Sequence, residues 1–298
     1  MSTELKTSFP PLGAHLSLQQ GKVSNIFNIV DHFNMQTFAC FLQQKIRWNP
    51  RNLSAKKTLS DAAEFKAGLK KRGISANNVI IHAPYIINIA SPKEDVRKKS
   101  LVLLENELKT LKTFGLRWSV LHPGSSVKGS GQTAEEGIQK IIDGLNHVLD
   151  ATAKDYSDCG ILLENNAGGG ACLGTTFTEL KAMRDGVVKE HRHRVAYCVD
   201  TCHAWASGYD IDDLKDDIEN EGIDLKNIKA FHFNDSKTPQ GSKKDRHADH
   251  TCGTIPHTDL KSLYNDSEFV NVPFIMEIPC SDIGLEQQML LMFSNNIN

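Results

Sequence analysis

The chain has 298 residues, 40% hydrophobic and 23% charged, which is ordinary for a globular protein built as one large α/β domain or two smaller ones. Its net charge of −2 argues against a protein that coats nucleic acid through bulk positive charge, although bound divalent cations would reverse the sign locally. No apolar run is long enough to span a bilayer and no secretory signal is visible, so we expect an intracellular, non-secreted protein with reduced cysteines and no membrane partner.

Short apolar segments recur along the chain, and most are followed by a stretch with helical spacing of apolar residues. The predicted strands cover residues 12–17, 37–42, 79–82, 118–122, 160–165, 195–200, 228–233 and 274–278. The predicted helical stretches cover roughly residues 22–33, 55–72, 93–114, 133–153, 178–189, 211–220 and 284–293. Thr133 suits a helix N-terminus, although the spacing to the glutamates after it is not that of a perfect capping box.

Eight strand–helix units in this length are typical of a (β/α)₈ TIM barrel. The strands are almost continuously apolar, which suits a parallel sheet buried on both faces. A doubly wound sheet is the alternative. We therefore expect an α/β protein with a single TIM-barrel domain over residues 12–298, preceded by a flexible N-terminal extension over residues 1–11.

Ionisable side chains stand at the ends of six consecutive predicted strands and in the loops after them, and in a barrel these positions meet at the C-terminal face. The candidate metal ligands are His82, His122, Glu164, Asp200, His203, His232, Asp245, His247 and Glu277. Any one of them alone is more often a satisfied polar group or a helix cap. Six strands in a row ending this way favour a metal cluster, and imidazoles with carboxylates suit zinc or manganese.

Other polar motifs fit this site less well. Gly168–Gly170 lacks the Lys-Ser/Thr of a phosphate-binding loop, so we interpret its glycines as a tight turn past the metals. His250 is close enough to Asp245 in the sequence to be an alternative metal ligand, but it is a weaker candidate. Cys198 and Cys202 are not spaced as a redox pair, and we interpret both as inert thiols.

The ordered motifs resemble those of endonuclease IV, the zinc-dependent apurinic/apyrimidinic endonuclease of base-excision repair, over nearly the whole chain. The matching stretches are 13–17 (GAHLS), 82–90 (HAPYIINIA), 121–124 (LHPG), 163–165 (LEN), 199–203 (VDTCH), 232–236 (HFNDS), 245–247 (DRH) and Glu277. The resemblance implies a monomer that cleaves double-stranded DNA 5′ to abasic sites, leaving a 3′-hydroxyl and a 5′-deoxyribose phosphate. It also implies cleaning of 3′-blocked ends and 3′–5′ exonuclease activity.

The resemblance further implies three zinc ions, with Mn²⁺ as an alternative at one site. One ion would be held by His82, His122 and Glu164, the second by Glu164 with Asp200, His232 and Glu277, and the third by His203, Asp245 and His247. By the same resemblance, Glu164 and Glu277 would be the catalytic residues that orient the attacking water.

The DNA-contacting residues of the family are only partly retained. Tyr85 and Ile86 match the pair that fills the gap in the DNA, and Arg246 matches an arginine that contacts DNA. Ile46 occupies the position of the family's intercalating arginine, and Arg47 beside it is the candidate substitute.

Two other functions are open to such a barrel. A sugar isomerase or epimerase would use the quartet Glu164, Asp200, His232 and Glu277, and a metal- or DNA-binding protein would bind without catalysis. An isomerase needs one or two metals and a proton-transfer residue. The five additional ligands therefore favour the nuclease.

Overall fold

The computed structural model describes residues 9–17, 23–249 and 252–277. The predicted helix at 284–293 and residues 1–8 of the predicted extension lie outside these ranges. The described part of that extension lies against the barrel. The Pro10 carbonyl oxygen accepts a hydrogen bond from the Tyr264 hydroxyl at 2.9 Å, and the Pro11 carbonyl oxygen accepts one from the Phe274 amide at 2.8 Å.

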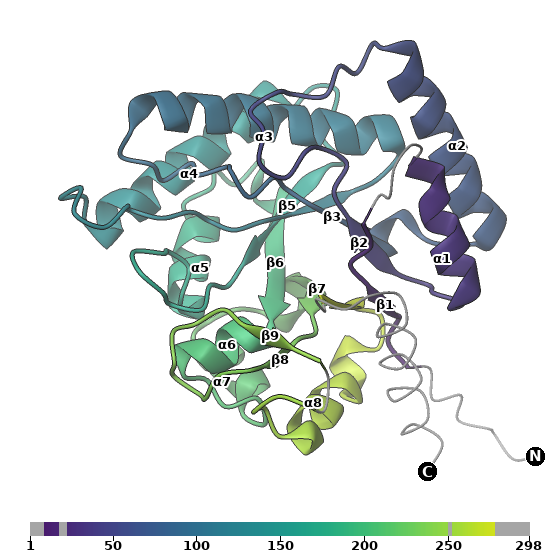
Figure 1. The fold of residues 1–298 in the computed structure, drawn as a ribbon. Coiled ribbons are helices and arrows are strands. Elements are labelled where there is room, and N and C mark those ends of the chain that lie inside the picture. Colours follow the sequence, from purple (N-terminus) through teal and green to yellow (C-terminus); the bar gives the residue numbers. More distant parts are fainter. Residues whose placement is uncertain (1–8, 18–22, 250–251, 278–298) are drawn as a thin grey trace, which may run out of the picture.

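Parallel strands form a nearly closed barrel with helices around it (Figure 1). The strands are β1 (Leu12–Ala14), β2 (Phe38–Cys40), β3 (Val79–His82), β4 (Trp118–Leu121), β5 (Gly160–Glu164), β6 (Val195–Asp200), β7 (Ile228–His232) and β10 (Phe274–Met276). Their order around the barrel follows their order in the chain. A doubly wound sheet would reverse that order at a switch point. The TIM-barrel prediction is therefore confirmed, and the doubly wound alternative is wrong.

Helices follow most strands and cover the outside of the barrel (Figure 1). They are α1 (Ile26–His32), α2 (Lys56–Arg72), α3 (Glu94–Phe114), α4 (Ala134–Ala151), α5 (Phe177–Asp185), α6 (Thr201–Ser207), α7 (Leu214–Asn220) and α8 (His257–Tyr264). Single 3-10 turns occur at Val23–Asn25, Ala76–Asn78, Arg192–Arg194, Leu225–Asn227 and Ser267–Phe269. A short antiparallel pair, β8 (Asp235–Ser236) with β9 (His247–Ala248), lies after β7. None of the described helices is long and apolar enough to cross a membrane.

The structure contains elements that the sequence did not predict, and some predicted elements are shorter than expected. Helices α6 and α8 and the β8–β9 pair were not predicted, and strand β1 is three residues shorter than expected. The expectation of an imperfect capping box at α4 is wrong. Thr133 Oγ1 accepts from the Glu136 amide at 3.2 Å, and Glu136 Oε2 accepts from the Thr133 amide at 2.9 Å. Glu136, three residues after Thr133, is the reciprocal partner.

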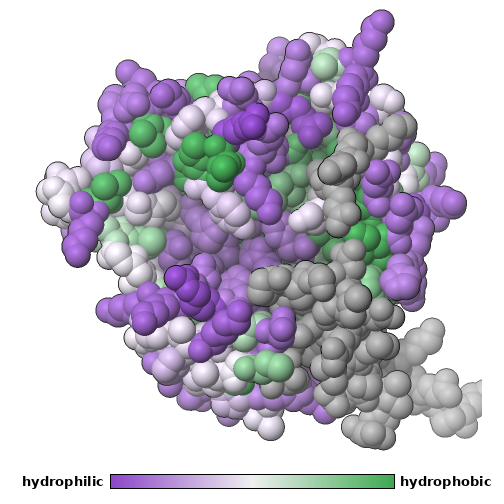
Figure 2. All heavy atoms as spheres, viewed as in Figure 1, coloured by the Kyte–Doolittle hydropathy of each residue, from purple (hydrophilic) through white to green (hydrophobic). Residues whose placement is uncertain are grey.

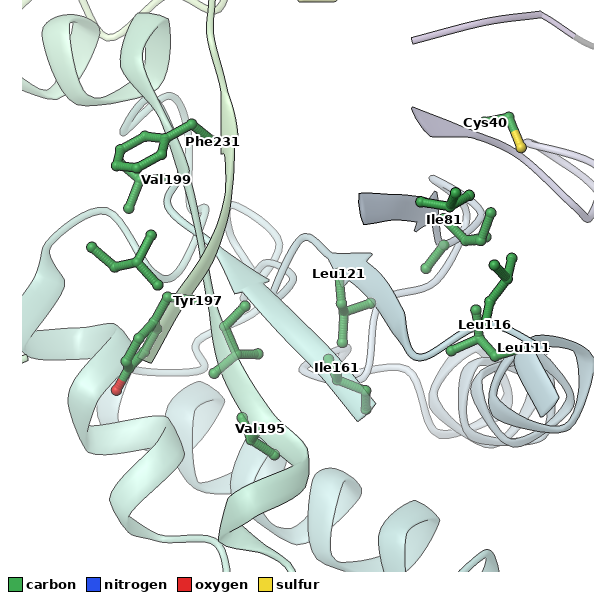
Figure 3. Packing of buried hydrophobic residues seen from close by; sticks show 14 of the residues in the cluster. Cys40, Ile81, Leu111, Leu116, Leu121, Ile161, Val195, Tyr197, Val199 and Phe231 are labelled. Atoms are coloured by element: carbon green, nitrogen blue, oxygen red, sulfur yellow. The ribbon is translucent and has the colours of Figure 1, made fainter. Parts of the chain in front are cut away.

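Alternating strand residues build two hydrophobic layers. Side chains such as Ile80, Leu162 and Ala230 fill the inside of the barrel. The residues between them face the helices, where Tyr197 and Phe231 belong to the larger outer cluster (Figure 3). Because both faces of most strands are fully buried, most of the strands read as continuous apolar runs, with partly exposed Lys229 in β7 as an exception.

The barrel closes where the first strand meets its two neighbours. Strand β1 pairs with β10, and just beyond it the Leu16 amide donates to the Ala39 carbonyl oxygen of β2 at 2.7 Å. Gly13 allows this approach, because a Cβ there would lie 1.9 Å from the Thr37 carbonyl oxygen. The closing joint therefore depends on a residue without a side chain.

We expect Gly13→Ala to destabilise the fold by about 1–3 kcal/mol, the usual cost of forcing extra volume into a packed region. Chemical denaturation monitored by circular dichroism measures this loss. Gly144→Ala on α4 is the control. The Cβ that alanine adds there would lie 3.2 Å from the nearest atom, which belongs to the Leu101 side chain, and alanine is a better helix former than glycine. Equal stability of the two variants would contradict the role of Gly13 in closure.

Candidate metal centre

The predicted metal ligands converge at the C-terminal mouth of the barrel. Four are the last residues of their strands and two directly follow a strand: His82, Glu164, Asp200 and His232, then His122 and Glu277. The other three come from α6, from the segment that connects β8 to β9, and from β9 itself: His203, Asp245 and His247. Together they form three groups, and in each group the candidate ligand atoms lie within 4.8 Å of one another. On the face drawn in Figure 2, hydrophilic residues line a recess.

The first group surrounds one oxygen of a fully buried carboxylate. His82 Nε2 lies 3.6 Å from Glu164 Oε2, and His122 Nε2 lies 3.4 Å from the same oxygen. This oxygen has no hydrogen-bond partner among the described residues. A buried carboxylate oxygen without a hydrogen bond is costly unless a cation compensates it.

The second group uses the other oxygen of Glu164. His232 Nδ1 lies 2.7 Å from Glu164 Oε1 and 3.2 Å from Glu277 Oε2. Asp200 completes the group. Because Glu164 belongs to both groups, one carboxylate joins them, as a bridging ligand between two ions would.

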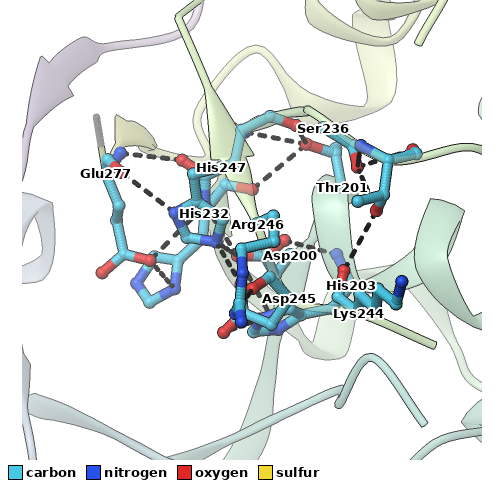
Figure 4. A network of polar contacts seen from close by, with 12 residues as sticks. Asp200, Thr201, His203, His232, Ser236, Lys244, Asp245, Arg246, His247 and Glu277 are labelled. Carbon is cyan, nitrogen blue, oxygen red and sulfur yellow. Dashed lines mark hydrogen bonds and ion pairs between the residues drawn. The ribbon is translucent and has the colours of Figure 1, made fainter. Parts of the chain in front are cut away.

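The third group lies beside the second (Figure 4). Asp245 lies between two imidazoles, with Oδ2 at 3.3 Å from His203 Nε2 and Oδ1 at 3.1 Å from His247 Nε2. Asp200 Oδ2 is 3.7 Å from His247 Nε2, which connects the second group to the third. The predicted ligands thus form one continuous cluster.

Hydrogen bonds orient three of the imidazoles toward this cluster. The Nδ1 atoms of His82, His203 and His247 lie 2.8, 2.9 and 3.0 Å from the backbone carbonyl oxygens of Ala83, Asn165 and Glu277. When Nδ1 donates to a carbonyl, the Nε2 lone pair is left for a metal ion. The donor set therefore fits divalent cations, and its imidazoles and carboxylates are ligand types that zinc accepts.

Two asparagines, to which the sequence assigned no role, hold Asp200 and Glu277 in place. The Asn165 side chain accepts from the Asp200 amide at 2.7 Å and donates to the Asp200 carbonyl oxygen at 3.0 Å. The Asn234 amide group donates to Asp200 Oδ2 at 2.6 Å, and its oxygen accepts from the Glu277 amide at 2.8 Å. Each asparagine lies within two residues of a candidate ligand, a signal that sequence reasoning could have used.

The electrostatics of Glu164 reflect its neighbours. Burial raises the pKa of this carboxyl, but His232 lowers it through both its charge and its hydrogen bond, and the pKa lies well below its usual value, so the group is ionised. Burial lowers the pKa of His122 to about 4, which leaves a neutral imidazole that can act as a ligand. The pKa of Asp200 is raised, mainly by burial.

The predicted DNA-contacting residues lie around the mouth in different settings. Tyr85 is 50% exposed, and its ring centroid lies 4.8 Å from that of His82. Ile86 is partly buried against the core. Arg246 is exposed beside Asp245, whereas Arg47 lines a groove of about 780 Å³ between the loop after β2 and the end of β1.

The loop after β2, which carries Ile46 and Arg47, is anchored at its base to α3. Gln43 Nε2 donates to Glu107 Oε2 at 2.5 Å, and the Arg51 amide donates to Gln43 Oε1 at 3.2 Å. Burial raises the pKa of Glu107 to about 7. At its tip Ile46 is 75% exposed.

The remaining motifs are a glycine turn and free cysteines, one of which, Cys202, also belongs to a candidate ligand group. Gly168 and Gly170 have positive φ values of 78° and 66°, as a tight turn requires. The cysteines among the described residues are free, and burial raises the pKa of Cys198 to about 11 and that of Cys202 to about 12. His250 lies outside the described residues.

Comparison with known proteins matches this chain to one family over most of its length. The family model described as xylose isomerase-like TIM barrel matches residues 27–292. A Thermotoga maritima protein described as a probable endonuclease 4 is 40% identical over 238 residues, covering 78% of this chain and 79% of that protein. Its Aquifex aeolicus counterpart, described in the same words, is 33% identical over 90% of this chain and 91% of that protein.

Solved structures agree. The crystal structure of endonuclease IV from Thermus thermophilus is similar with a TM-score of 0.81 and 27% identity, over 96% of this chain and 98% of that chain. A D-tagatose 3-epimerase-like protein has a TM-score of 0.71 at 16% identity, over 97% of this chain and 100% of that chain. That second likeness shows the fold alone.

We expect the metal affinity of the third group to rise with pH. Burial lowers the pKa of both imidazoles, but Asp200 and Asp245 outweigh it, so the pKa is about 10 for His203 and about 9 for His247. A metal ion must therefore displace protons from them. In the metal-free protein these protons stabilise the fold fully below about pH 6.5, and this contribution is lost as pH rises through 9–10.

Titration with zinc against a chromophoric chelator, repeated across this pH range, measures the effect. Asp245→Ala should weaken the pH dependence, because it removes a carboxylate that raises both pKa values. Affinity that stays level from neutral to alkaline pH in the unmodified protein would contradict the proton competition.

Proposed function

The chain belongs to the endonuclease IV family, and on this basis we propose that it is an apurinic/apyrimidinic endonuclease that hydrolyses the phosphodiester bond 5′ to an abasic site in double-stranded DNA. The products are a 3′-hydroxyl and a 5′-deoxyribose phosphate. The observation that carries the proposal is the continuity of three ligand groups through Glu164 and Asp200. The same hydrolysis also removes blocking groups from 3′ ends and gives 3′–5′ exonuclease activity. The protein acts as a monomer.

We propose that the three groups hold three zinc ions, with Mn²⁺ as an alternative at one of them. The first ion is held by His82, His122 and Glu164, the second by Glu164, Asp200, His232 and Glu277, and the third by His203, Asp245 and His247. Bound ions supply Lewis-acid stabilisation of phosphate charge and lower the pKa of water.

Glu164 and Glu277 differ in their exposure to solvent, and for this reason we assign them different roles. The Glu164 side chain is fully buried, whereas the Glu277 side chain is 12% exposed at the edge of the cluster. Burial raises the pKa of Glu277, but His232 and His15 lower it well below its usual value. Glu277 is therefore an ionised carboxylate at the solvent edge of the cluster, where it would orient the attacking water by accepting a hydrogen bond from it.

DNA enters across the side chains at the mouth. Tyr85 and Ile86 occupy the space left by the missing base, Arg47 substitutes for the family's intercalating arginine, and Arg246 contacts the backbone. A nucleotide without a base loses little stacking when it leaves the helix, which favours the lesion over intact DNA. Exposed Ile46 adds an apolar contact where the family resemblance places a charged one.

The extent of the cluster discriminates against the alternatives. A sugar isomerase on this barrel would use the second group, and nothing in its chemistry requires His82 with His122 or the Asp245 group. A silent binding protein would have no need for a partly exposed, ionised carboxylate beside the buried ligands. The likeness to epimerase structures, at low identity, extends to the fold only.

Incision of a duplex with one abasic analogue tests the activity, with metal content measured on the same preparation. We expect a single cut 5′ to the lesion. His247→Ala should lower turnover by more than 100-fold, since loss of a mere outer hydrogen-bond partner already costs about 10–100-fold. His147→Ala on α4 is the control, since this side chain is 59% exposed and pairs with Glu105 outside the cluster. A metal-loaded protein without 5′ incision would refute the proposal.

Salt dependence tests the predicted backbone contact of Arg246. Affinity for abasic duplex should fall steeply as salt rises, and Arg246→Ala should reduce the log–log slope by about one unit. Lys98→Ala serves as the control, because Lys98 is an exposed cation on α3 whose partner is Glu94. Fluorescence anisotropy gives both slopes. Identical slopes for the two variants would remove Arg246 from the interface.

A further inference from the structure

His15 is an imidazole of the cluster that belongs to none of the three ligand groups. It directly follows β1, and only 11% of its side chain is exposed. Its Nδ1 lies 3.1 Å from Glu277 Oε1, while its Nε2 is buried without a hydrogen-bond partner among the described residues. Sequence reasoning assigned His15 no role beyond its place in the 13–17 motif.

The backbone fixes His15 relative to Glu277. In the parallel pairing of β1 with β10, Ala14 lies opposite Met276, so the next residues along, His15 and Glu277, lie side by side. The His15 amide donates to the Met276 carbonyl oxygen at 2.8 Å. The barrel-closing joint that requires Gly13 therefore also sets the distance between this imidazole and this carboxylate.

The ring is also held by its neighbours. The Phe41 ring centroid lies 4.9 Å from that of His15, and the His82 ring is nearly parallel at 6.0 Å. With the backbone fixed and two aromatic rings packed against the imidazole, rotation that would remove Nδ1 from Glu277 is opposed by packing.

We propose that His15 is a positioning residue for Glu277. Its Nδ1–H binds Oε1, so that Oε2 is the oxygen turned to the second ligand group, where it lies 3.2 Å from His232 Nδ1. Asn234 restrains the same residue through the Glu277 amide. The consequence for turnover rests on the proposed function, whereas the consequence for metal binding does not.

Three substitutions separate hydrogen bonding from packing. His15→Ala removes the donor, His15→Asn keeps an amide nitrogen near the position of Nδ1, and His15→Gln places one near Nε2. We expect His15→Ala to lower metal affinity and kcat by about 10–100-fold, as loss of a partner that orients a metal ligand does. KM for abasic duplex should change little. His15→Asn should restore most of both losses, and His15→Gln should not.

Zinc affinity by chelator competition and metal content by mass spectrometry are measured on each purified full-length variant, beside kcat and KM. Unchanged affinity and kcat in His15→Ala would overturn the proposal, as would equal rescue by asparagine and glutamine. If His15→Ala does not fold, the comparison of zinc affinity and kcat between His15→Asn and His15→Gln tests the proposal by itself. If the unmodified protein does not cut abasic DNA, the proposed function fails, and the zinc affinities still test His15.

Discussion

A carboxylate buried among imidazoles is the constraint on which the rest of the site depends. Glu164 is fully buried, and its two oxygens face His82 and His122 on one side and His232 on the other. An ionised group in that position is tolerated only with cationic compensation close by. Strands β3, β4, β5 and β7 must therefore end at the same height, which a barrel of parallel strands achieves.

Much of this could be predicted from the sequence, for a physical reason. Strands buried on both faces appear as apolar runs, and in a parallel barrel the residue that ends each run is directed to a common mouth. The position of His82, Glu164, Asp200 and His232 in space thus follows from their position at strand ends. The barrel and the grouping of the candidate ligands could therefore be predicted from the sequence.

What could not be predicted depends on pairing between distant segments. The contact of His15 with Glu277 arises from the pairing of the first strand with the last, which no local pattern reports. Helix α6 has only seven residues, and its N-cap is Asp200, whose Oδ1 accepts from the His203 amide at 2.7 Å. The Asp200 carboxylate thus caps a helix and also faces the other candidate ligands. The sequence pattern assigned Asp200 to the metal site, and the helix that it caps was not predicted.

The strand order around the barrel also has a consequence for biosynthesis. Translation runs from the N-terminus, so the residues of the first ligand group are made before those of the third, and Glu277 on the closing side of the barrel is made last of all. His15 is among the first residues made, and it can contact Glu277 only after β10 has been made and has paired with β1. A chain that stops short of Glu277 can carry histidines for metal, yet it lacks one carboxylate of the second ligand group and the strand pairing that holds it. The candidate ligand set is thus completed only after most of the chain has been made.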